Sequence, residues 1–327
     1  MKSRLLWITD PWDTLDHAND TTLRIAQAAL AQGIDCFWCD VKTLRWDQTR
    51  VVADISRIVS IGDARGPEDF ELTPPQPEDP AVYERLLYRT DPPVDLAYLH
   101  PLQLLQLAVE LKRAQGPCAA EIVSPADLLF SANEKLDGAH LPSLMPATLA
   151  ASRWDNLEAF GRAEGLTILK PLFEAQSKGV ALLDWRTSEG IDHARTIIQK
   201  STDDFQRPVL LQRYLEKIKQ GEQRLWFLNG KLIGQARKVP KSGESIINMD
   251  LGGSVVPTQL TDGEKAAALM IGDYLRERKV RMAAVDLIDG LVTDFNFTSP
   301  GLIIHLEKAM GLDLATPIAA SLAQPWA

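Results

Sequence analysis

The sequence predicts an α/β fold whose C-terminal part is α+β, from its length and two patterns along the chain. The 327 residues are enough for two or three units with their own cores, since single domains usually run about 100–200 residues. Near the N-terminus a strand, a helix and a second strand follow one another, as in open α/β sheets. Near the C-terminus two apolar, β-rich runs meet at Asp289-Gly290, which predicts a β-hairpin.

The first of these patterns is delimited by capping signals. Leu5–Thr9 is apolar and ends at Asp10-Pro11, and Asp20-Thr21-Thr22 offers caps for a helix over Leu23–Gln32. Gly33 ends that helix, and Ile34–Cys39 reads as the next strand. The remaining elements expected before Val123 are a surface loop, a strand, a turn and a helix, at Gly66–Pro80, Leu86–Arg89, Thr90–Pro93 and Leu99–Ala114. Together they predict a first unit over residues 1–123.

The rest of the chain alternates between strands and helices. Ser124-Pro125 predicts the start of a helix carrying Leu128–Leu136. A second unit over 124–205 should contain strands at Thr167–Lys170 and Val180–Asp184 and a helix at Ser188–Lys200. A third unit over 206–327 should contain strands at Val209–Gln212, Arg224–Leu228 and Lys231–Lys238, a helix at Glu264–Lys279 and the hairpin at Asp286–Phe297.

Composition limits the functions that the chain can serve. The chain is 45% hydrophobic and 24% charged, as expected of a soluble globular protein. Its net charge of −9, from 35 basic and 44 acidic residues, argues against nucleic-acid binding, which usually needs a basic surface. Small anionic ligands stay compatible, because a local group of Lys and Arg can bind phosphate on an acidic protein.

Targeting and redox signals are weak. The N-terminal apolar run is too short for a signal peptide, and no run of about 18 apolar residues predicts a membrane span. We therefore expect a cytoplasmic protein without membrane contact. Cys36, Cys39 and Cys118 do not make a disulfide framework. Cys36 and Cys39 lie in a predicted strand, where we expect buried thiols rather than a redox pair.

The C-terminal hairpin carries the first candidate site. Asp286, Asp294 and Asn296 are polar residues within its apolar runs. Carboxylate and amide oxygens on a rigid hairpin suit Mg²⁺ when phosphate oxygens and waters complete its coordination. A strict two-residue turn at Asp289-Gly290 would place Asp286 and Asp294 on opposite faces. We therefore predict a bulge or an odd-length loop at Asp289-Gly290-Leu291, because a one-residue slip inverts the facing of a strand.

Three further segments place polar side chains beside predicted element ends. They are Asn133-Glu134-Lys135-Leu136 near a helix end, Leu169-Lys170-Pro171-Leu172 at a strand end, and Gln212-Arg213-Tyr214-Leu215, followed by Glu222 and Arg224. Each lysine taken alone is more often a solvated surface charge. As an ordered set with the acidic hairpin, these segments resemble the ATP-grasp superfamily and, within it, prokaryotic glutathione synthetases.

The resemblance covers essentially the whole chain and rests on further matching segments. They are Asp10-Pro11, Arg89-Thr90-Asp91-Pro92-Pro93, Gly221-Glu222-Gln223-Arg224, Gly252-Gly253 and Asn296-Phe297-Thr298-Ser299-Pro300. It implies an ATP-grasp fold with a Rossmann-like N-terminal domain. It also implies an ATP-dependent carboxylate–amine ligase that uses Mg²⁺, or Mn²⁺ in its place, and small amino acid or peptide substrates. A homo-oligomer is compatible with the resemblance.

The resemblance assigns roles to the matching residues. ATP would be bound by Lys135, Lys170, Lys178, Gln212, Arg213, Tyr214, Leu215, Glu222 and Asn248, with the backbone of 212–215 as the adenine hinge. Arg224 and Lys238 would be catalytic, stabilising the phosphoryl group in transfer. Asp286, Asp294 and Asn296 would hold the metal, and Asp10, Arg89, Thr298 and Ser299 would bind the substrate.

Several positions depart from the family pattern. The glycine-rich lid is Phe173–Lys178 with Gly179 retained, and Ile246, Ser254 and Lys238 stand where arginines are expected. The usual metal-binding glutamate is Asp294. The leading reading is a ligase joining γ-glutamylcysteine to glycine. The alternatives are a ligase of the same scaffold with another amino acid or small peptide, and a nucleotide-binding protein without catalysis.

Overall fold

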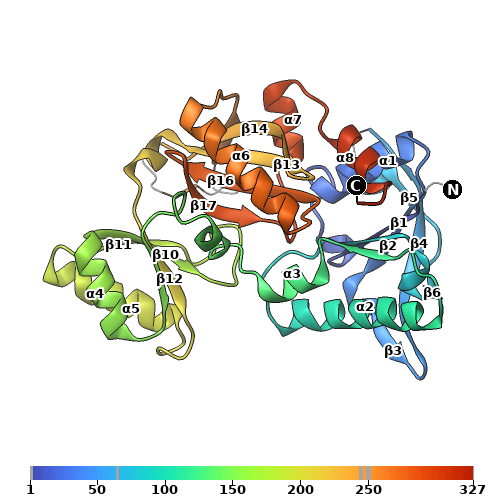
Figure 1. Ribbon diagram of the computed structural model, residues 1–327, viewed down its shortest axis with the longest axis horizontal. Helices are drawn as coiled ribbons and strands as arrows, with labels where there is room; N and C mark the ends of the chain where they lie inside the picture. The colour runs from blue at the N-terminus through green and yellow to red at the C-terminus, as the bar shows by residue number, and fades with distance from the viewer. Residues whose placement is uncertain (1–2, 64–65, 243–245, 248–251, 327) are drawn as a thin grey trace.

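The computed structural model describes residues 3–63, 66–242, 246–247 and 252–326, and it contains three β-sheets. The first lies near the N-terminus, the second forms a lobe at the far end of the molecule, and the third lies between them (Figure 1). No helix in the described part is long and apolar enough to cross a membrane.

The first sheet has the parallel core that the sequence predicts. Its strands run in the order β3-β4-β2-β1-β7-β8, and β1 lies parallel to both β2 and β7. Their bounds are β1 Leu5–Thr9, β2 Cys36–Asp40, β3 Arg45–Asp47, β4 Arg50–Ile61, β5 Phe70–Leu72, β6 Gln76–Glu78, β7 Arg85–Tyr88 and β8 Glu121–Val123. The loop predicted over Gly66–Pro80 is wrong in part, because β5 and β6 pair with the long strand β4.

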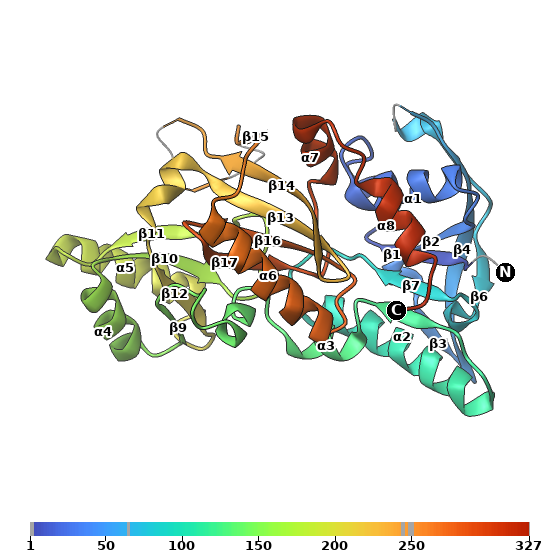
Figure 2. The same ribbon diagram turned by 45° about the horizontal axis from the view of Figure 1, so that its top comes forward.

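Successive side chains of β1 point to opposite faces of the first sheet and pack into two separate hydrophobic cores. Leu6 and Ile8 face the helix α2 (Leu96–Gln115), whereas Leu5 and Trp7 face α1 (Thr21–Ala31) and α8 (Ala315–Leu322). The helices α1 and α8 lie side by side on that face (Figures 1 and 2). The C-terminal helix therefore completes the core of the N-terminal sheet.

The two cysteines of β2 are buried, as predicted. Cys36 and Cys39 are both 0% exposed, and both thiols are free. Burial raises the pKa of the Cys36 thiol to about 12. A thiol with so high a pKa is not a thiolate at neutral pH, so neither residue fits a redox role.

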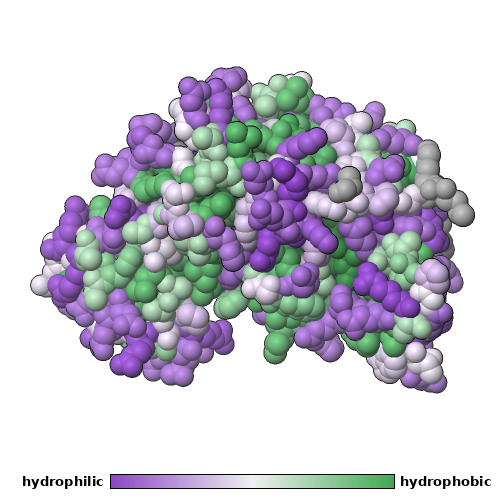
Figure 3. Space-filling view, in the orientation of Figure 1, coloured by the Kyte–Doolittle hydropathy of each residue, from purple (hydrophilic) through white to green (hydrophobic). Residues whose placement is uncertain are grey.

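The second sheet is antiparallel, with strand order β11-β10-β12-β9. Its elements are β9 Thr148–Ala151, α4 Trp154–Glu164, β10 Leu166–Pro171, β11 Ala181–Asp184, α5 Ser188–Ser201 and β12 Val209–Arg213. The helices α4 and α5 cover one face, where Leu157 and Ile198 pack on Leu169 and Leu211. The lobe that carries α4 and α5 is set off by a notch at the lower edge of the space-filling view (Figure 3).

The third sheet is also antiparallel, with strand order β15-β14-β13-β16-β17. Its strands are β13 Glu222–Leu228, β14 Lys231–Val239, β15 Ser254–Val256, β16 Met282–Ile288 and β17 Leu291–Asn296. The helix α6 (Asp262–Glu277) packs on one face, and α7 (Ile303–Met310) packs on one end of the other. The remaining part of that other face is free to line a cleft toward the second sheet.

The short helix α3 links the first sheet to the second. It spans Ala126–Ser131, so the helix predicted to carry Leu128–Leu136 ends five residues early. Asn133–Leu136 forms a turn instead, in which the backbone N–H groups of Leu136 and Asp137 donate to the Asn133 carbonyl. Lys135 therefore lies in a turn and not at a helix end.

Candidate active site

A cleft of about 950 Å³, part of it open to solvent, lies between the second and third sheets. It brings together thirteen residues predicted for the nucleotide, the metal and catalysis: Lys135, Lys170, Lys178, Gln212, Arg213, Tyr214, Leu215, Glu222, Arg224, Lys238, Asp286, Asp294 and Asn296. Asn248, also predicted to bind ATP, lies outside the described residues. Segments far apart in the chain thus converge on one space.

Alternation along β10 and β12 delivers the polar residues of the second sheet. Ile168 and Lys170 point away from the helix-covered face, and Gln212 lies beside them on β12. The Lys170 ammonium donates to the Gln212 side-chain oxygen (3.1 Å) and to the carbonyl of Thr293 on β17 (2.6 Å). Burial lowers the pKa of Lys170. This lysine therefore bridges the two sheets across the floor of the cleft.

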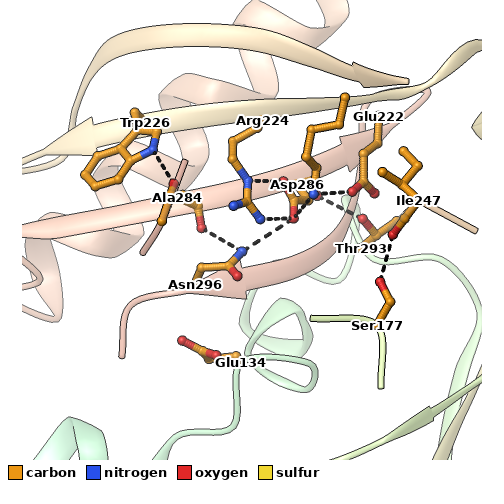
Figure 4. Close-up of polar contacts among 12 residues, drawn as sticks. Glu134, Ser177, Glu222, Arg224, Trp226, Ile247, Ala284, Asp286, Thr293 and Asn296 are labelled. Carbon is orange, nitrogen blue, oxygen red and sulfur yellow. Dashed lines mark hydrogen bonds and ion pairs between the residues drawn. The ribbon is translucent and has the colours of Figure 1, made fainter. Parts of the chain in front are cut away.

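The third sheet contributes a compact group of charges. Arg224 of β13 lies opposite Asp286 of β16, and Glu222 lies opposite Lys238 of β14. The Arg224 guanidinium donates two hydrogen bonds to the Asp286 carboxylate, from Nε to Oδ1 at 2.9 Å and from Nη2 to Oδ2 at 2.6 Å. Lys238 donates to Asp286 Oδ2 at 2.9 Å and also pairs with Glu222 (Figure 4).

This group is neutral as a whole, with two cations and two carboxylates, and it is buried. Burial opposes ionisation of Asp286, but Arg224 and Lys238 outweigh that effect and hold its pKa well below the usual value. The pKa of Glu222 is raised, because burial exceeds the effect of Lys238. A polyanion entering the cleft would meet Arg224 and Lys238 already oriented on one wall.

The facing of Asp294 depends on a bulge in the β16–β17 hairpin. Asp289 and Gly290 have φ of 54° and 76° and form a tight two-residue turn of the kind that hairpins favour. The bulge predicted at Asp289-Gly290-Leu291 is therefore misplaced. The register shift comes after two regular pairs, Ile288–Leu291 and Leu287–Val292, so that Asp286 lies opposite Asp294 and Thr293 is the extra residue. Asp286 and Asp294 consequently share one face, as the metal assignment requires.

The oxygen donors available to a metal are on β17. Asp294 Oδ1 is buried and has no hydrogen-bond partner among the described residues. Asn296 donates through Nδ2 to the Ala284 carbonyl at 3.3 Å, and its amide oxygen is directed away from Asp286 (Figure 4). A buried carboxylate oxygen without a donor is costly unless a cation or water satisfies it. This donor set fits a hard divalent cation.

The Asn133–Leu136 turn also borders the cleft, through Lys135. The Lys135 ammonium donates to the Glu174 carbonyl, and the Asn133 side chain donates to the Leu172 carbonyl at 2.7 Å. Glu134 was given no role by the sequence. Its carboxylate accepts from the backbone of Phe297 and Thr298, and burial together with Asp294 raises its pKa to about 7.

The loop between β10 and β11 covers the cleft. Gln176 and Ser177 have φ of 55° and 59°, a left-handed conformation that glycine adopts most readily. The Ser177 hydroxyl donates to the Ile247 carbonyl at 2.8 Å, which joins the loop to the segment after β14 (Figure 4). Lys178 of the same loop lines the cleft. The loop thus keeps a glycine-like backbone although its sequence lacks glycine there.

The predicted adenine hinge, residues 212–215, begins in the last two residues of β12 and continues past its end. Tyr214 and Leu215 line the cleft beside apolar Ile168 and Ile288. The Arg213 side chain turns outward and pairs with Glu164 at 2.5 Å, so only the rest of that residue can serve the cleft. The apolar side chains of Ile168 and Ile288 beside this segment suit a flat heterocycle.

The residues predicted to bind substrate gather beside the cleft and not in its lining. Arg89 is buried, and it donates to the carbonyl of Pro300 and to the Thr22 hydroxyl, both at 3.0 Å. Ser299 donates to the Arg89 carbonyl at 3.4 Å. Asp10 accepts from the backbone of Asp91 at 2.9 Å. Thr298 lines a second cavity next to Lys135 and Glu134.

Sequence reasoning missed some lining groups. Thr293 contributes a backbone carbonyl, Glu174 does the same, and Ile247 closes the cleft through its carbonyl. Backbone groups carry no residue-type signal, so no pattern could have found them. Glu134 is different, because it lies inside the Asn133–Leu136 motif, which was recognised for its lysine.

Comparison with known families agrees with this geometry. Residues 3–114 match the N-terminal domain of prokaryotic glutathione synthetase, and residues 134–311 match the ATP-grasp domain of prokaryotic glutathione synthetase. The chain belongs to the prokaryotic glutathione synthetase family. As a member of this family it is an ATP-dependent ligase of the glutathione synthetase type, an enzyme that forms C–N bonds.

Relatives of the family align along nearly the whole chain. A glutathione synthetase from Prochlorococcus marinus is 31% identical over 98% of this chain and 98% of its own length. Another from Gloeobacter violaceus is 31% identical over 96% of this chain and 95% of its own length. Family membership thus holds for the N-terminal sheet as well as for the cleft.

Solved structures confirm the ATP-grasp fold. The crystal structure of D-cycloserine synthetase DcsG superposes with a TM-score of 0.62 at 17% identity, covering 98% of both chains. The ATP-grasp ligase PsnB, complexed with a phosphomimetic variant of a minimal precursor, Mg and ADP, gives a TM-score of 0.63 at 14% identity over 98% of both chains. At such identities the likeness concerns the fold alone.

Proposed function

We propose that this ligase joins γ-glutamylcysteine to glycine with ATP, through an acyl phosphate. The observation that supports this proposal is the convergence of Lys135, Lys170, Arg224 and Lys238 around one cleft with an Asp294 oxygen that has no partner among the described residues. A site with this many fixed cations suits a triphosphate, and the acidic donors beside them suit its metal.

The proposed reaction has two steps. A carboxylate oxygen of the peptide attacks the γ-phosphorus of ATP, the bond from that phosphorus to the β–γ bridging oxygen breaks, and ADP leaves. The amine of glycine then attacks the carbonyl carbon of the acyl phosphate, loses a proton, and phosphate departs with the C–O bond electrons. Activation is needed because a carboxylate oxygen is a poor leaving group before it carries phosphate.

We assign the nucleotide to the residues that line the cleft. Lys135, Lys170 and Lys178 would neutralise phosphates, and Glu222 would face the sugar. The backbone of residues 212–215 would hold the adenine against the apolar side chains beside it. Arg224 and Lys238 would bind the phosphoryl group in transfer, where preoriented positive charge stabilises the loose transition state.

We assign the divalent metal to the third sheet. Asp294 and Asn296 offer oxygens, whereas both oxygens of Asp286 accept from cations in the structure. Asp286 would thus hold Arg224 and Lys238 in place and would also contribute a carboxylate oxygen to the coordination of the metal. Mg²⁺ is the metal we propose, with Mn²⁺ as its substitute, and it would supply charge neutralisation at the phosphates when bound.

We place the peptide and amine substrates where the first sheet meets the loop after β17. The contacts of Arg89 with Ser299 and Pro300 support this placement, as does one Arg89 nitrogen, Nη1, which is buried without a partner among the described residues. Asp10 and Thr298 would complete this subsite.

A second function is a ligase of the same scaffold that takes another amino acid or small peptide. It is favoured by Ile246, an apolar residue in the cleft lining where the family pattern leads one to expect an arginine. Losing a guanidinium there would change recognition of a substrate carboxylate more than recognition of ATP.

Phosphate release measured with ATP, Mg²⁺ and a panel of dipeptides and amines tests these proposals. Release only with γ-glutamylcysteine and glycine supports the first function, and release only with another pair supports the second. Nucleotide binding without release under any combination refutes both and leaves a nucleotide-binding protein without catalysis.

The matched variants are Asp294→Asn and Asp289→Asn, which change one carboxylate each on the same hairpin. Asp289 lies in the exposed turn and pairs with Lys217. We expect Asp294→Asn to lower turnover at least about a hundredfold with little loss of folding stability, because only the charge facing the phosphates is removed. Asp289→Asn should leave turnover unchanged, and equal effects of the two variants would contradict the metal assignment.

We also propose that the chain divides into three units, the first ending near residue 123 and the second after Arg213 instead of at residue 205, where the sequence predicted it. The β12 strand, Val209–Arg213, pairs with β9 and β10 of the second sheet. This pairing supports moving the second boundary to follow Arg213. Tyr214, Leu215 and Ile218, which lie between there and Glu222, line the cleft.

A further inference from the structure

Glu134 is tied to the end of β17 by its side chain. One carboxylate oxygen, Oε1, accepts from the backbone N–H of Phe297 at 2.7 Å, from the backbone N–H of Thr298 at 2.8 Å and from the Thr298 hydroxyl at 2.9 Å. Bonds from backbone N–H groups to a carboxylate are charge-assisted and about twice as strong as neutral ones. A partly buried acid that attracts three donors to one oxygen fixes the loop that carries them.

The backbone of Glu134 makes a further hydrogen bond to β17. Its carbonyl accepts from the backbone N–H of Phe295 at 2.9 Å. Asn296 is thus flanked on both sides by residues attached to Glu134, and Asp294 directly precedes the first of them. Neither proposed metal donor can shift along the sheet without breaking one of these bonds.

The same turn is attached to the second sheet. Asn133 donates to the Leu172 carbonyl at 2.7 Å, and Lys135 donates to the Glu174 carbonyl. Both acceptors lie at the start of the loop that covers the cleft. The turn therefore connects that loop to the β17 strand. Asn133 and Lys135 bind the loop, and Glu134, which lies between them, binds the end of β17.

We propose that Glu134 is a positioning residue that sets Asp294 and Asn296 relative to Lys135, so that metal and phosphates bind in register. The inference rests on the proposed function, since it needs a metal at β17 and a triphosphate at Lys135. The Glu134 side chain acts through Phe297 and Thr298, whereas the backbone bond to Phe295 would remain with any residue at position 134. Outer groups of this kind typically change metal affinity by about tenfold to a hundredfold.

The experiment measures metal binding without relying on turnover. The melting temperature of the full chain is recorded with ATP and EDTA, and then with ATP over a Mg²⁺ titration, for the wild type and for Glu134→Ala. We expect the Mg²⁺ concentration that gives half of the metal-dependent stabilisation to rise at least about tenfold in Glu134→Ala. The shift caused by ATP with EDTA should change much less.

Two further variants separate positioning from general loss of structure. Glu134→Gln keeps one acceptor oxygen and should recover part of the Mg²⁺ affinity. Tyr274→Phe removes the hydrogen bond from the Tyr274 hydroxyl to Asp137 (2.5 Å), a buried contact of the same chain segment. That variant should keep the Mg²⁺ requirement of the wild type, even where its melting temperature falls.

The outcomes are distinct. A Mg²⁺ requirement in Glu134→Ala equal to that of the wild type, or an equal rise in Tyr274→Phe, overturns the positioning role. If Glu134→Ala does not fold, the decision passes to Glu134→Gln, where an unchanged requirement overturns the role and a severalfold rise supports it. If the wild type itself shows no Mg²⁺-dependent stabilisation, the metal assignment of the proposed function is wrong, and this inference is refuted with it.

Discussion

The charge balance of the third sheet makes a quantitative prediction for Asp286→Asn. Asp286 is 3% exposed and accepts from Arg224 and Lys238, each of which is 7% exposed. Replacing the carboxylate by a neutral amide keeps the shape but leaves two buried cations with Glu222 as the only carboxylate of the group. Removing one partner of a buried ion pair typically costs about 3–5 kcal/mol. We expect a loss of that size in the free energy of unfolding.

Chemical denaturation in urea without ligand measures this loss. Asp184→Asn is the matched control, because Asp184 also pairs with an arginine, Arg186, but in an exposed position. Water screens such a pair, so the control should unfold close to the wild type. A loss in Asp286→Asn no greater than that of the control would refute the calculation.

ATP provides a second test of the same reasoning. A triphosphate brings back the negative charge that Asp286→Asn lacks, so ATP with EDTA should stabilise the variant more than it stabilises the wild type. Differential scanning fluorimetry over an ATP titration compares the two increments. Equal increments would show that Arg224 and Lys238 do not face the phosphates, and the catalytic assignment of these residues would fall.

Three further predictions concern other parts of the structure. Lys170→Met leaves the Thr293 carbonyl without its donor and removes a cation from the cleft floor. The affinity for ATP, measured by calorimetry, should therefore fall at least about tenfold, or about 1.4 kcal/mol. An unchanged affinity would contradict the phosphate role of Lys170. The folded-state pKa of Asp286 is held below its usual value near 3.8, so its stabilisation is present above that pH and lost as the pH falls. The stability gap between wild type and Asp286→Asn should therefore stay constant well above pH 3.8 and shrink as the pH falls below that value, and a gap that does not shrink there would contradict the ion pairing. Gly161→Ala would place a Cβ 2.1 Å from the Trp185 ring, and the overpacking should cost about 1–3 kcal/mol in thermal unfolding, whereas an unchanged melting temperature would show that α4 shifts freely.

The sequence predicted which residues line the cleft better than it predicted the local backbone geometry there. The resemblance to ATP-grasp enzymes, carried by short segments at predicted element ends, was what placed Lys170, Arg224 and Asp294 in one site. The bulge was predicted in the turn itself, whereas it lies at Thr293 within β17, because its position is set by a contact outside the hairpin. Asp289-Gly290 closes the turn by local preference, whereas Thr293 is displaced where its carbonyl meets Lys170, 123 residues earlier in the chain.

Fold elements without a strong local signal were also missed. The strand β4, Arg50–Ile61, pairs with β2, β3, β5 and β6, and its partners include short strands at Phe70–Leu72 and Gln76–Glu78. Three-residue strands rich in Pro and Glu have little strand propensity of their own. They exist because β4 offers an edge, which is information that no window of sequence contains.

The position of α8 affects the order in which the chain can mature. Ile318 and Leu322 of α8 share a core with Leu5 and Trp7 of the first strand. During synthesis the N-terminal sheet emerges before α8, so the part of this face that α8 covers beside α1 stays exposed until α8 leaves the ribosome. We expect nascent chains that stop before residue 315 to expose this apolar face and to be recognised by chaperones, even when every residue of the cleft has already been made.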